Sequence, residues 1–436
     1  MVVCKTLVNS TGIFWVIVLL FAGCTTSADL EWHGEEGYRW AELSPAFFGS
    51  TGFQKLDSTD TGIRFRNFVS EERIEENRNF LNGSGVATAD VDGDGRVDIY
   101  LARLEGPNKL YRNLGSFEFE DITEEANLAH EGYHSTGVVF ADVNGDSHPD
   151  LLVTSLAQGN ELYINDGEGR FALKGDSGLG PSNGSNTMTL ADIDKDGDLD
   201  LYITNYKLKT VRDIYSAEEL STENTVRREG DSLVVVPPFD KYYGIIETEG
   251  QSYRNEYGTK DELYINGGEG AFRKVDNDKD YFMAADGSEQ GLSRDWGLTA
   301  KFQDVNGDGY PDLYVANDFW TPDRMWMNRG DGTFRSIDRN AIRNMSFSAM
   351  GVDFSDINRD GAVDIFVTEM LSGNHQRRLR QLSEHLDPIE GRPQYNRNSL
   401  YLNRGDHTFA EISNYGNVTA TEWSWATNFL DIDLDG

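Results

Sequence analysis

One nine-residue pattern recurs along the chain and carries the side chains best suited to chemistry. It has aspartate or asparagine at positions 1, 3, 5 and 9, and glycine at position 6 in every copy but one. These side-chain oxygens, with the backbone carbonyl of position 7, are the ligands that a hard cation takes. Positions 1, 3, 5, 7 and 9 are Asp90, Asp92, Asp94, Arg96 and Asp98; Asp142, Asn144, Asp146, His148 and Asp150; Asp192, Asp194, Asp196, Asp198 and Asp200; Asp304, Asn306, Asp308, Tyr310 and Asp312; Asp356, Asn358, Asp360, Ala362 and Asp364; and, in an incomplete sixth copy, Asp431, Asp433 and Asp435.

Calcium is the cation that this pattern favours, because magnesium prefers octahedral, water-rich sites. Without a cation the carboxylates would repel one another, since two that lie about 5 Å apart cost about 3 kcal/mol at an effective dielectric of 20. An acidic Asx turn with no ion is the alternative for any single loop. Six copies with one spacing favour the cation, and we expect about one Ca²⁺ for each complete loop.

The loops differ from EF-hands in their flanking segments. An EF-hand needs a bidentate glutamate at position 12 and a helix on either side. Position 12 is apolar here, and strand-like segments such as Asp312–Asn317 come after each loop. The residues at position 12 are Leu101, Val153, Ile203, Val315 and Val367. The sequence therefore places each cation in the turn of a β-hairpin.

The loops belong to a longer repeat. Their first aspartates lie at 90, 142, 192, 304, 356 and 431, which gives a period near 50 residues with longer third and fifth units. Each unit contains four strand patterns, which in the first unit cover 85–89, 97–103, 108–113 and 117–122. Four short strands in about 50 residues are typical of a propeller blade. We predict an all-β fold, a β-propeller of four-stranded blades whose repeated aromatic residues pack blade against blade.

Closure of the ring is also suggested by the sequence. Residues 53–56 and 61–65 have the pattern of a fourth strand that arrives before any first strand, and a propeller can close by pairing such a strand with its last blade. The printed sequence stops inside the sixth loop, before position 9. We therefore expect a missing C-terminal part and seven blades, rather than six, in the intact protein.

Composition excludes several classes of function. A formal charge of −35 argues against nucleic-acid binding, which needs a basic surface. The two cysteines, Cys4 and Cys24, both lie near the N-terminus. The folded part therefore has no disulfide, cysteine zinc site or cysteine nucleophile available to it.

Residues 1–24 are predicted to be an export signal. Lys5 precedes an apolar run over Ile13–Ala22, which is shorter than the roughly 20 residues of a membrane-spanning helix. Leu20–Cys24 resembles a bacterial lipobox, which implies lipidation of Cys24, although Phe21 departs from the usual leucine. An ordinary signal peptide is the alternative. We expect an exported protein, an outer-membrane or cell-surface lipoprotein held to the membrane by its lipid alone, or otherwise a secreted one.

Residues 25–49 are predicted to be a linker, and residues 50–436 the propeller, with insertions near 206–258 and 371–395. Long insertions between strands usually cover one face of a propeller and meet ligands there. The alternative is that they are surface loops packed on a neighbouring blade. The second insertion contains a basic helical stretch over 375–382.

The loop, followed by a Leu-Tyr-Val-type strand, resembles FG-GAP/VCBS repeats. Residues 82–87, 398–409 and 421–425 make the chain similar to the exported family related to cartilage acidic protein, which often ends in an ASPIC/UnbV domain. The resemblance covers roughly residues 50–436. It implies calcium binding and an extracellular role in cell adhesion or interaction, without implying one established reaction.

Two functions are compatible with these features. The first is an exported calcium-binding propeller that binds an extracellular glycan or protein, with the aspartates as structural metal ligands and no catalytic residue. Their even distribution over the units favours this, because catalysis needs one site. The alternative is a calcium-dependent polysaccharide lyase or hydrolase, whose candidate residues are His375, Arg377, Arg378, Arg380 and His385.

Overall fold

The computed structural model describes residues 32–35, 38–41, 53–248, 251–381 and 392–431. The chain divides into two units, Met1–Phe53 with Leu430–Gly436, and Gln54–Phe429. In the first unit, strands β1 (Trp32–Glu35) and β2 (Tyr38–Ala41) form an antiparallel hairpin. The predicted export signal and Cys24 lie outside the described residues. Within the part of the chain that is described, no helix is long and apolar enough to cross a membrane.

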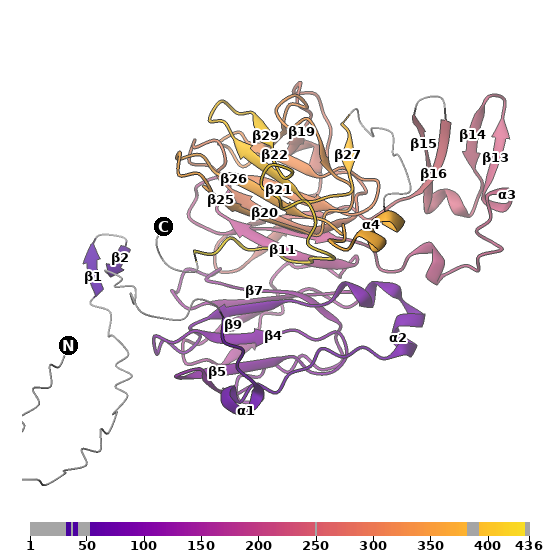
Figure 1. The fold of residues 1–436 in the computed structure, drawn as a ribbon. Helices are drawn as coiled ribbons and strands as arrows, with labels where there is room; N and C mark the ends of the chain where they lie inside the picture. The colour runs from indigo at the N-terminus through magenta and orange to yellow at the C-terminus, as the bar shows by residue number, and fades with distance from the viewer. Residues whose placement is uncertain (1–31, 36–37, 42–52, 249–250, 382–391, 432–436) are drawn as a thin grey trace, which may run out of the picture. The chain divides into compact units, whose positions relative to one another are not determined.

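The second unit contains five large sheets, four of them four-stranded and one five-stranded, and we call their sets of four consecutive antiparallel strands blades 1 to 5 (Figure 1). In each blade the four strands lie side by side in chain order. The blades are β3 (Val86–Ala89), β4 (Asp98–Leu101), β5 (Lys109–Gly115) and β6 (Glu118–Asp121); β7 (Ser135–Ala141), β8 (Asp150–Ser155), β9 (Glu161–Asn165) and β10 (Phe171–Leu173); β11 (Ser185–Ala191), β12 (Asp200–Asn205), β17 (Glu262–Asn266) and β18 (Phe272–Lys274); β20 (Gly297–Gln303), β21 (Asp312–Asn317), β22 (Arg324–Asn328) and β23 (Phe334–Ser336); and β25 (Gly351–Ser355), β26 (Asp364–Thr368), β28 (Ser399–Asn403) and β29 (Phe409–Glu411).

Successive blades pack through their first strands and through the apolar faces of the strands behind them. The first strands follow one another as β3, β7, β11, β20 and β25. Threonine hydroxyls join neighbouring first strands, as where Thr136 Oγ1 donates to the Ser185 carbonyl at 2.7 Å and Thr299 Oγ1 to that of Met350 at 2.9 Å. Phe171 of blade 2 packs in one cluster with Tyr100 of blade 1. The predictions of an all-β propeller and of aromatic packing between blades are confirmed.

The second strand of a blade lies between two other strands and between neighbouring blades. All six residues of β8, β12 and β21 are accordingly buried. The backbone hydrogen bonds of such a strand are made with the strands on either side of it, and its side chains pack against protein on both faces. This explains why those side chains are mostly apolar or aromatic. Its first residue is nevertheless the position-9 aspartate of the acidic loop.

The predicted leading strand over 53–56 and 61–65 is wrong. Asp57 caps the short helix α1 (Ser58–Thr61), because its side chain accepts the Thr59 N–H at 2.7 Å, and Gly62 ends the turn at φ 77°. These local bonds satisfy the backbone where the sequence pattern indicated a strand. The segment continues through α2 (Glu71–Glu76) and the 3₁₀ turn η1 (Arg78–Asn82).

The first insertion is a folded element with a small core. It contains two antiparallel hairpins, and its core includes Val211, Leu220 and Phe239. Its elements are η2 (Val211–Asp213), α3 (Thr222–Thr225), β13 (Val226–Glu229), β14 (Ser232–Val235), η3 (Phe239–Lys241), β15 (Tyr243–Thr248) and β16 (Gln251–Glu256).

The second insertion forms the predicted helix α4 (His375–Gln381). It also supplies β27 (Gln394–Tyr395), which pairs in parallel with β24 (Met345–Ser346). The remaining elements, η4 (Asp278–Asp280) and β19 (Phe282–Met283), lead to blade 4, where β19 pairs with β23.

The insertions and the acidic loops leave the blades at opposite ends. Each acidic loop connects a first strand to a second strand, whereas both insertions follow a second strand, β12 or β26. Because neighbouring strands are antiparallel, these connections lie at opposite ends of the sheet. Figure 1 shows both hairpins and α4 on one side of the blades.

Candidate metal sites in the blade hairpins

Each complete acidic loop forms the turn of a β-hairpin, as predicted. In blade 1, Ala89 lies opposite Asp98, so the loop begins and ends at one rung of the ladder. The position-1 aspartate shapes the turn, because Asp90 accepts the N–H groups of Asp94 at 3.1 Å and Gly95 at 2.8 Å. Asp142, Asp192, Asp304 and Asp356 accept the same two N–H groups of their own loops.

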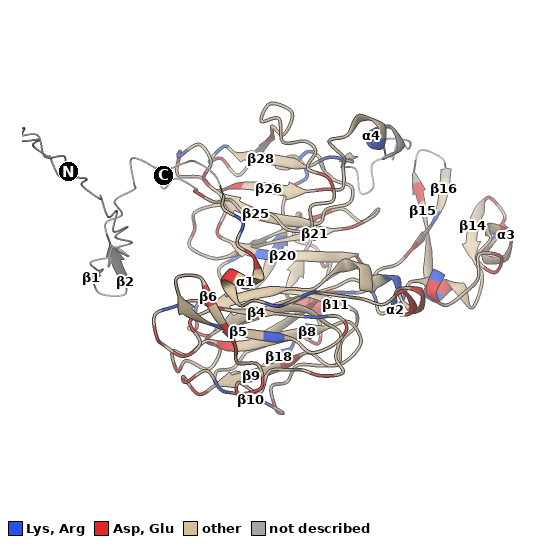
Figure 2. Cartoon of the chain, turned by 60° about the horizontal axis from the view of Figure 1, so that its bottom comes forward, with Lys and Arg blue, Asp and Glu red and all other residues tan. Residues whose placement is uncertain are grey.

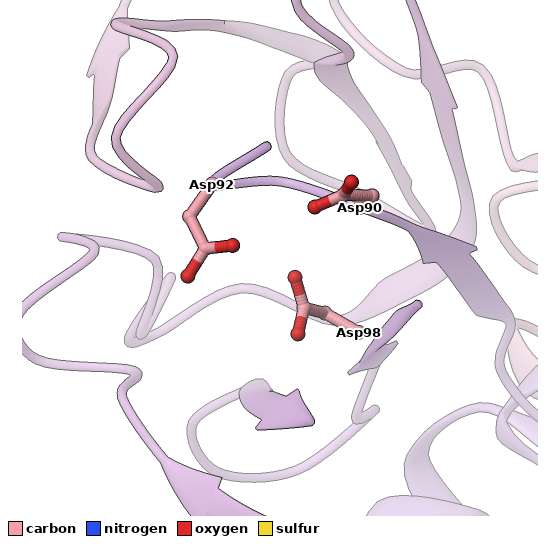
Figure 3. Close-up of side chains that lie close together, drawn as sticks. All are labelled: Asp90, Asp92 and Asp98. Atoms are coloured by element: carbon pink, nitrogen blue, oxygen red, sulfur yellow. The ribbon is translucent and has the colours of Figure 1, made fainter. Parts of the chain in front are cut away.

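Two of the loops bring three carboxylates together. Ligand atoms of Asp90, Asp92 and Asp98 all lie within 4.8 Å of one another, and the same holds for Asp192, Asp194 and Asp200. Figure 3 shows the first three carboxylates pointing toward a common space. Oxygens so arranged suit a calcium ion, which takes six to eight of them.

The other three complete loops have asparagine at position 3. Its amide nitrogen donates to the position-5 aspartate, as from Asn306 Nδ2 to Asp308 Oδ2 at 2.9 Å. Asn144 and Asn358 make the same contact. These loops carry one negative charge fewer than the loops of blades 1 and 3, and ligand charge tunes calcium affinity. Calcium is therefore expected to bind most tightly in blades 1 and 3.

Position 9 has a second role that the sequence did not reveal. Asp312 accepts two backbone N–H groups, those of Asn328 at 2.8 Å and Val305 at 3.1 Å. One donor belongs to the third strand and the other to the loop itself. The same pair of bonds holds Asp98, Asp150, Asp200 and Asp364. We call this repeated arrangement the carboxylate clamp.

Burial opposes ionisation of the carboxylate clamp. It raises the pKa of Asp200 and of Asp312 to about 7 and that of Asp150 to about 6, and nearby loop carboxylates act in the same direction. The two backbone N–H bonds act against this shift. A bound divalent cation would favour the ionised form, because its charge inverts the local balance.

In blades 2 to 5 an asparagine at the end of the third strand connects neighbouring blades. Asn328 Nδ2 donates to the carbonyl of Ile193, in the loop of the preceding blade, at 2.9 Å and to that of Pro311 in its own loop at 3.2 Å. Asn165, Asn266 and Asn403 make equivalent bonds to Val91, Val143 and Val305. The sequence showed this asparagine in every unit, but its partner comes from another blade. The shape of these four loops thus depends on the following blade.

Two positions of the loop have left-handed backbone. At position 6, Ser147 has φ 72° where Gly309 has φ 85°, so the one loop without glycine at this position carries backbone strain there. Position 4 is left-handed as well, with φ 62° at Lys195 and 57° at Arg359. The backbone of Lys195 and Arg359 therefore carries the same kind of strain as that of Ser147. Lys195 Nζ lies 3.7 Å from the centre of the Tyr310 ring, a contact that offsets part of the cost.

Replacing Ser147 with glycine is expected to stabilise the protein. The left-handed conformation costs a non-glycine residue energy that exceeds the entropy lost by glycine, so Ser147→Gly should gain about 0.5–1 kcal/mol. Chemical denaturation in the presence of calcium measures the change. Gly309→Ser is the matched reverse substitution and should lose a similar amount. Equal stability of the two variants would contradict the account.

The position-7 side chains lie outside the ligand set, since only their carbonyls were expected to bind. The backbone N–H group of each position-7 residue donates to the position-5 aspartate, as from Tyr310 to Asp308 at 2.8 Å. In blade 1 the Arg96 guanidinium also pairs with the Asp94 side chain, which competes with a cation for that carboxylate. In the incomplete copy, Asp431 is described, while Asp433 and Asp435 lie outside the described residues.

The comparisons with known sequences agree with this geometry. The family described as FG-GAP-like repeat matches residues 90–153, 142–203 and 304–367, and each match runs from one acidic loop into the second strand of the next blade. The chain contains FG-GAP-like repeats. Cartilage acidic protein 1 of Mus musculus is 28% identical over 201 residues, which is 45% of this chain and 30% of that protein. The Xenopus tropicalis protein of the same name is 26% identical over 129 residues, 29% of this chain and 20% of the relative. The matched region thus spans less than a third of either relative.

Solved structures resemble this chain more loosely. One is a lectin of Agrocybe aegerita, described as recognising non-reducing terminal N-acetylglucosamine, with a TM-score of 0.39, 17% identity, and coverage of 74% of this chain and 63% of the lectin. Another is the biofilm matrix protein Bap1 of V. cholerae, with a TM-score of 0.33, 14% identity, and coverage of 74% and 38%. At such scores the ligands of those proteins do not transfer to this chain.

The residues considered for catalysis are only partly described. Arg377 lies 3.5 Å from Glu422, and Arg378 Nε donates to the Ser372 carbonyl at 3.0 Å. Both contacts attach α4 to the surrounding chain. His375 is exposed at the start of the helix, and His385 and the side chain of Arg380 lie outside the described residues.

Proposed function

We propose that the protein is an exported, calcium-binding propeller that acts as an extracellular binding module for a glycan or a protein. The observation that carries the proposal is the difference between the two ends of the blades. One end repeats a single loop geometry five times among the described residues, whereas the other end bears two insertions unlike each other. Loops that repeat one geometry suit a structural role, whereas insertions that differ from each other suit recognition of a specific ligand.

The acidic end supports a structural role for calcium. The same bonds recur at positions 1 and 9 of every complete loop, and third-strand asparagines link four of these loops to the following blade. A cation in one loop would therefore stiffen two blades. Calcium is available at millimolar concentration outside cells, where modules with affinities of about 10⁻⁴–10⁻³ M are loaded. An export signal over residues 1–24, with lipidation of Cys24, would place the protein there.

The insertion end supports recognition. The first insertion has its own core, so its surface is held in shape before any ligand arrives. Pre-formed surfaces bind without the cost of ordering a loop. Figure 2 shows lysine and arginine near α2, at the base of the β15–β16 hairpin and in α4, at this end of an acidic protein.

A panel of immobilised polysaccharides tests the proposal. The calcium-loaded protein without its signal is expected to be retained on at least one glycan, with no oligosaccharide released. Retention should fall in chelator, because the blades that hold the insertions loosen. Released products would contradict a binding role and make His375 the first residue to change. The proposal would be contradicted if no glycan retained the protein and if, in a parallel assay, the protein captured no extracellular protein.

A further inference from the structure

A positively charged pocket lies where the first insertion meets blades 3 and 4. Its volume is about 310 Å³, at the lower end for pockets that hold small ligands. Its lining comes from segments far apart in sequence: the approach to β11, the chain after β12, the turn η3 with the residue after it, the chain after β16 and the approach to β20. The basic residues among them are Lys207, Lys209, Lys241 and Arg294.

Two of these cations are neutralised by partners. Lys207 is buried, and its Nζ donates to Glu256 at 2.6 Å and to the Tyr257 carbonyl at 2.7 Å. Burial lowers the pKa of Lys207, while Glu256 opposes that shift. Lys209 lies 3.5 Å from Glu76. The first ion pair joins the two ends of the insertion, and the second attaches the insertion to α2.

The other two cations stay available at the mouth of the pocket. Lys241 and Arg294 are both exposed, and Arg294 donates to the Lys241 carbonyl at 3.1 Å, so the two lie next to each other. Each charged group lies over an aromatic ring, with Lys241 Nζ 4.6 Å from the centre of the Tyr242 ring and the Arg294 guanidinium carbon 4.4 Å from that of Tyr257. Among the described residues, neither forms an ion pair with a carboxylate. In a protein with a formal charge of −35, two adjacent unpaired cations indicate an anionic ligand.

The rest of the lining narrows the class of ligand. Tyr242, Leu208 and Ile214 present apolar surface, and Asn183 and Thr259 present neutral hydrogen-bonding groups. A sugar that carries an acid group needs all three kinds of contact: a charge partner, partners for hydroxyls, and a surface for its C–H face. The acidic loops lie at the other end of the blades, and charges farther away than about 8 Å are largely screened at physiological ionic strength.

We propose that this pocket binds an acidic residue of an extracellular polysaccharide. The carboxylate or sulfate lies between Lys241 and Arg294, and the ring of the sugar lies against Tyr242. Arginine offers planar paired donors that match an oxyanion, and lysine adds a point charge. The inference rests on the proposed extracellular binding role and names the ligand class for it.

The test is a calorimetric titration of the calcium-loaded protein with four soluble saccharides: hyaluronan oligosaccharides, chondroitin sulfate oligosaccharides, dextran sulfate and neutral dextran. We expect binding to at least one acidic saccharide and none to dextran. Binding to hyaluronan assigns the site to carboxylates, and binding only to the sulfated chains assigns it to sulfate. Lys241→Gln and Arg294→Gln should each weaken binding about tenfold, the loss of one charged hydrogen bond.

Arg228→Gln is the matched control, because Arg228 is exposed on β13 of the same insertion and does not line the pocket. It removes the same charge and should leave affinity unchanged. All three variants should melt with the parent, since the positions are exposed. If dextran bound as tightly as the acidic saccharides, or if the pocket variants bound like Arg228→Gln, this pocket would not be the acidic-sugar site. The proposed function as a binding module would be unaffected by either result. Poly-glutamate bound as tightly as the best saccharide would overturn the ligand class, and no binding to any saccharide would overturn the inference whether or not a protein partner is found.

Discussion

Chelating calcium is expected to lower the melting temperature of the protein by about 3–9 °C. Extracellular calcium modules bind with dissociation constants of about 10⁻⁴–10⁻³ M. At millimolar calcium each occupied loop then adds about 0.4–1.4 kcal/mol to the free energy of unfolding. Five loops sum to about 2–7 kcal/mol, and each kcal/mol moves the melting temperature of a domain of this size by about 1–1.5 °C.

The structure gives two reasons to expect a stabilising effect of calcium. The carboxylates of Asp90, Asp92 and Asp98 lie close enough to repel when they are ionised, and a cation converts that repulsion into attraction. The loops are also joined to neighbouring blades through residues such as Asn328, so unfolding one loop disturbs the next blade. Calcium therefore acts on the assembly of blades as well as on single turns.

Circular dichroism melts in calcium, in chelator and in magnesium measure the effect. Magnesium should restore little of the loss, because the loops offer more oxygens than an octahedral ion accepts. Replacing Asp92 and Asp94, at positions 3 and 5 of the blade 1 loop, with asparagine should remove a fraction of the calcium effect and leave the melt in chelator almost unchanged. A melt that chelator does not alter would contradict calcium as a structural ligand.

The sequence predicted the blades because their signals are local. Alternating side chains, the glycine turn and the oxygen spacing of Asp304–Asp312 all lie within a dozen residues of one another. The prediction of a leading strand was wrong for a reason that is also local: the capping hydrogen bonds of Asp57 determine the conformation of the residues next to it. A strand pattern does not show which of two local arrangements satisfies the backbone better.

The parts of the site that the sequence missed depend on segments that are distant along the chain. Asp200 receives one of its two N–H bonds from Asn266, which the first insertion separates from it. The pocket combines Lys241 from a turn of that insertion with Arg294 from the approach to blade 4. No periodicity or spacing connects such residues before the blades assemble.

Asp312→Asn is expected to destabilise the protein by about 2–4 kcal/mol both with and without calcium, because an amide nitrogen would replace one of the two oxygens that accept buried N–H groups. The side chain of Asp312 is only 2% exposed, so water cannot replace the lost acceptor. Denaturation in calcium and in chelator measures both values.

Asp308→Asn is the control that separates the carboxylate clamp from metal binding. Asp308 is exposed at position 5 of the same loop, and an asparagine there can still accept the Tyr310 N–H. Its substitution should cost about 1 kcal/mol in calcium and almost nothing in chelator, since one loop loses part of its affinity. If Asp312→Asn behaved in the same way, position 9 would be a metal ligand alone. A loss that persists in chelator for Asp312 and vanishes for Asp308 would show that one nine-residue loop divides its aspartates between holding an ion and holding the blade.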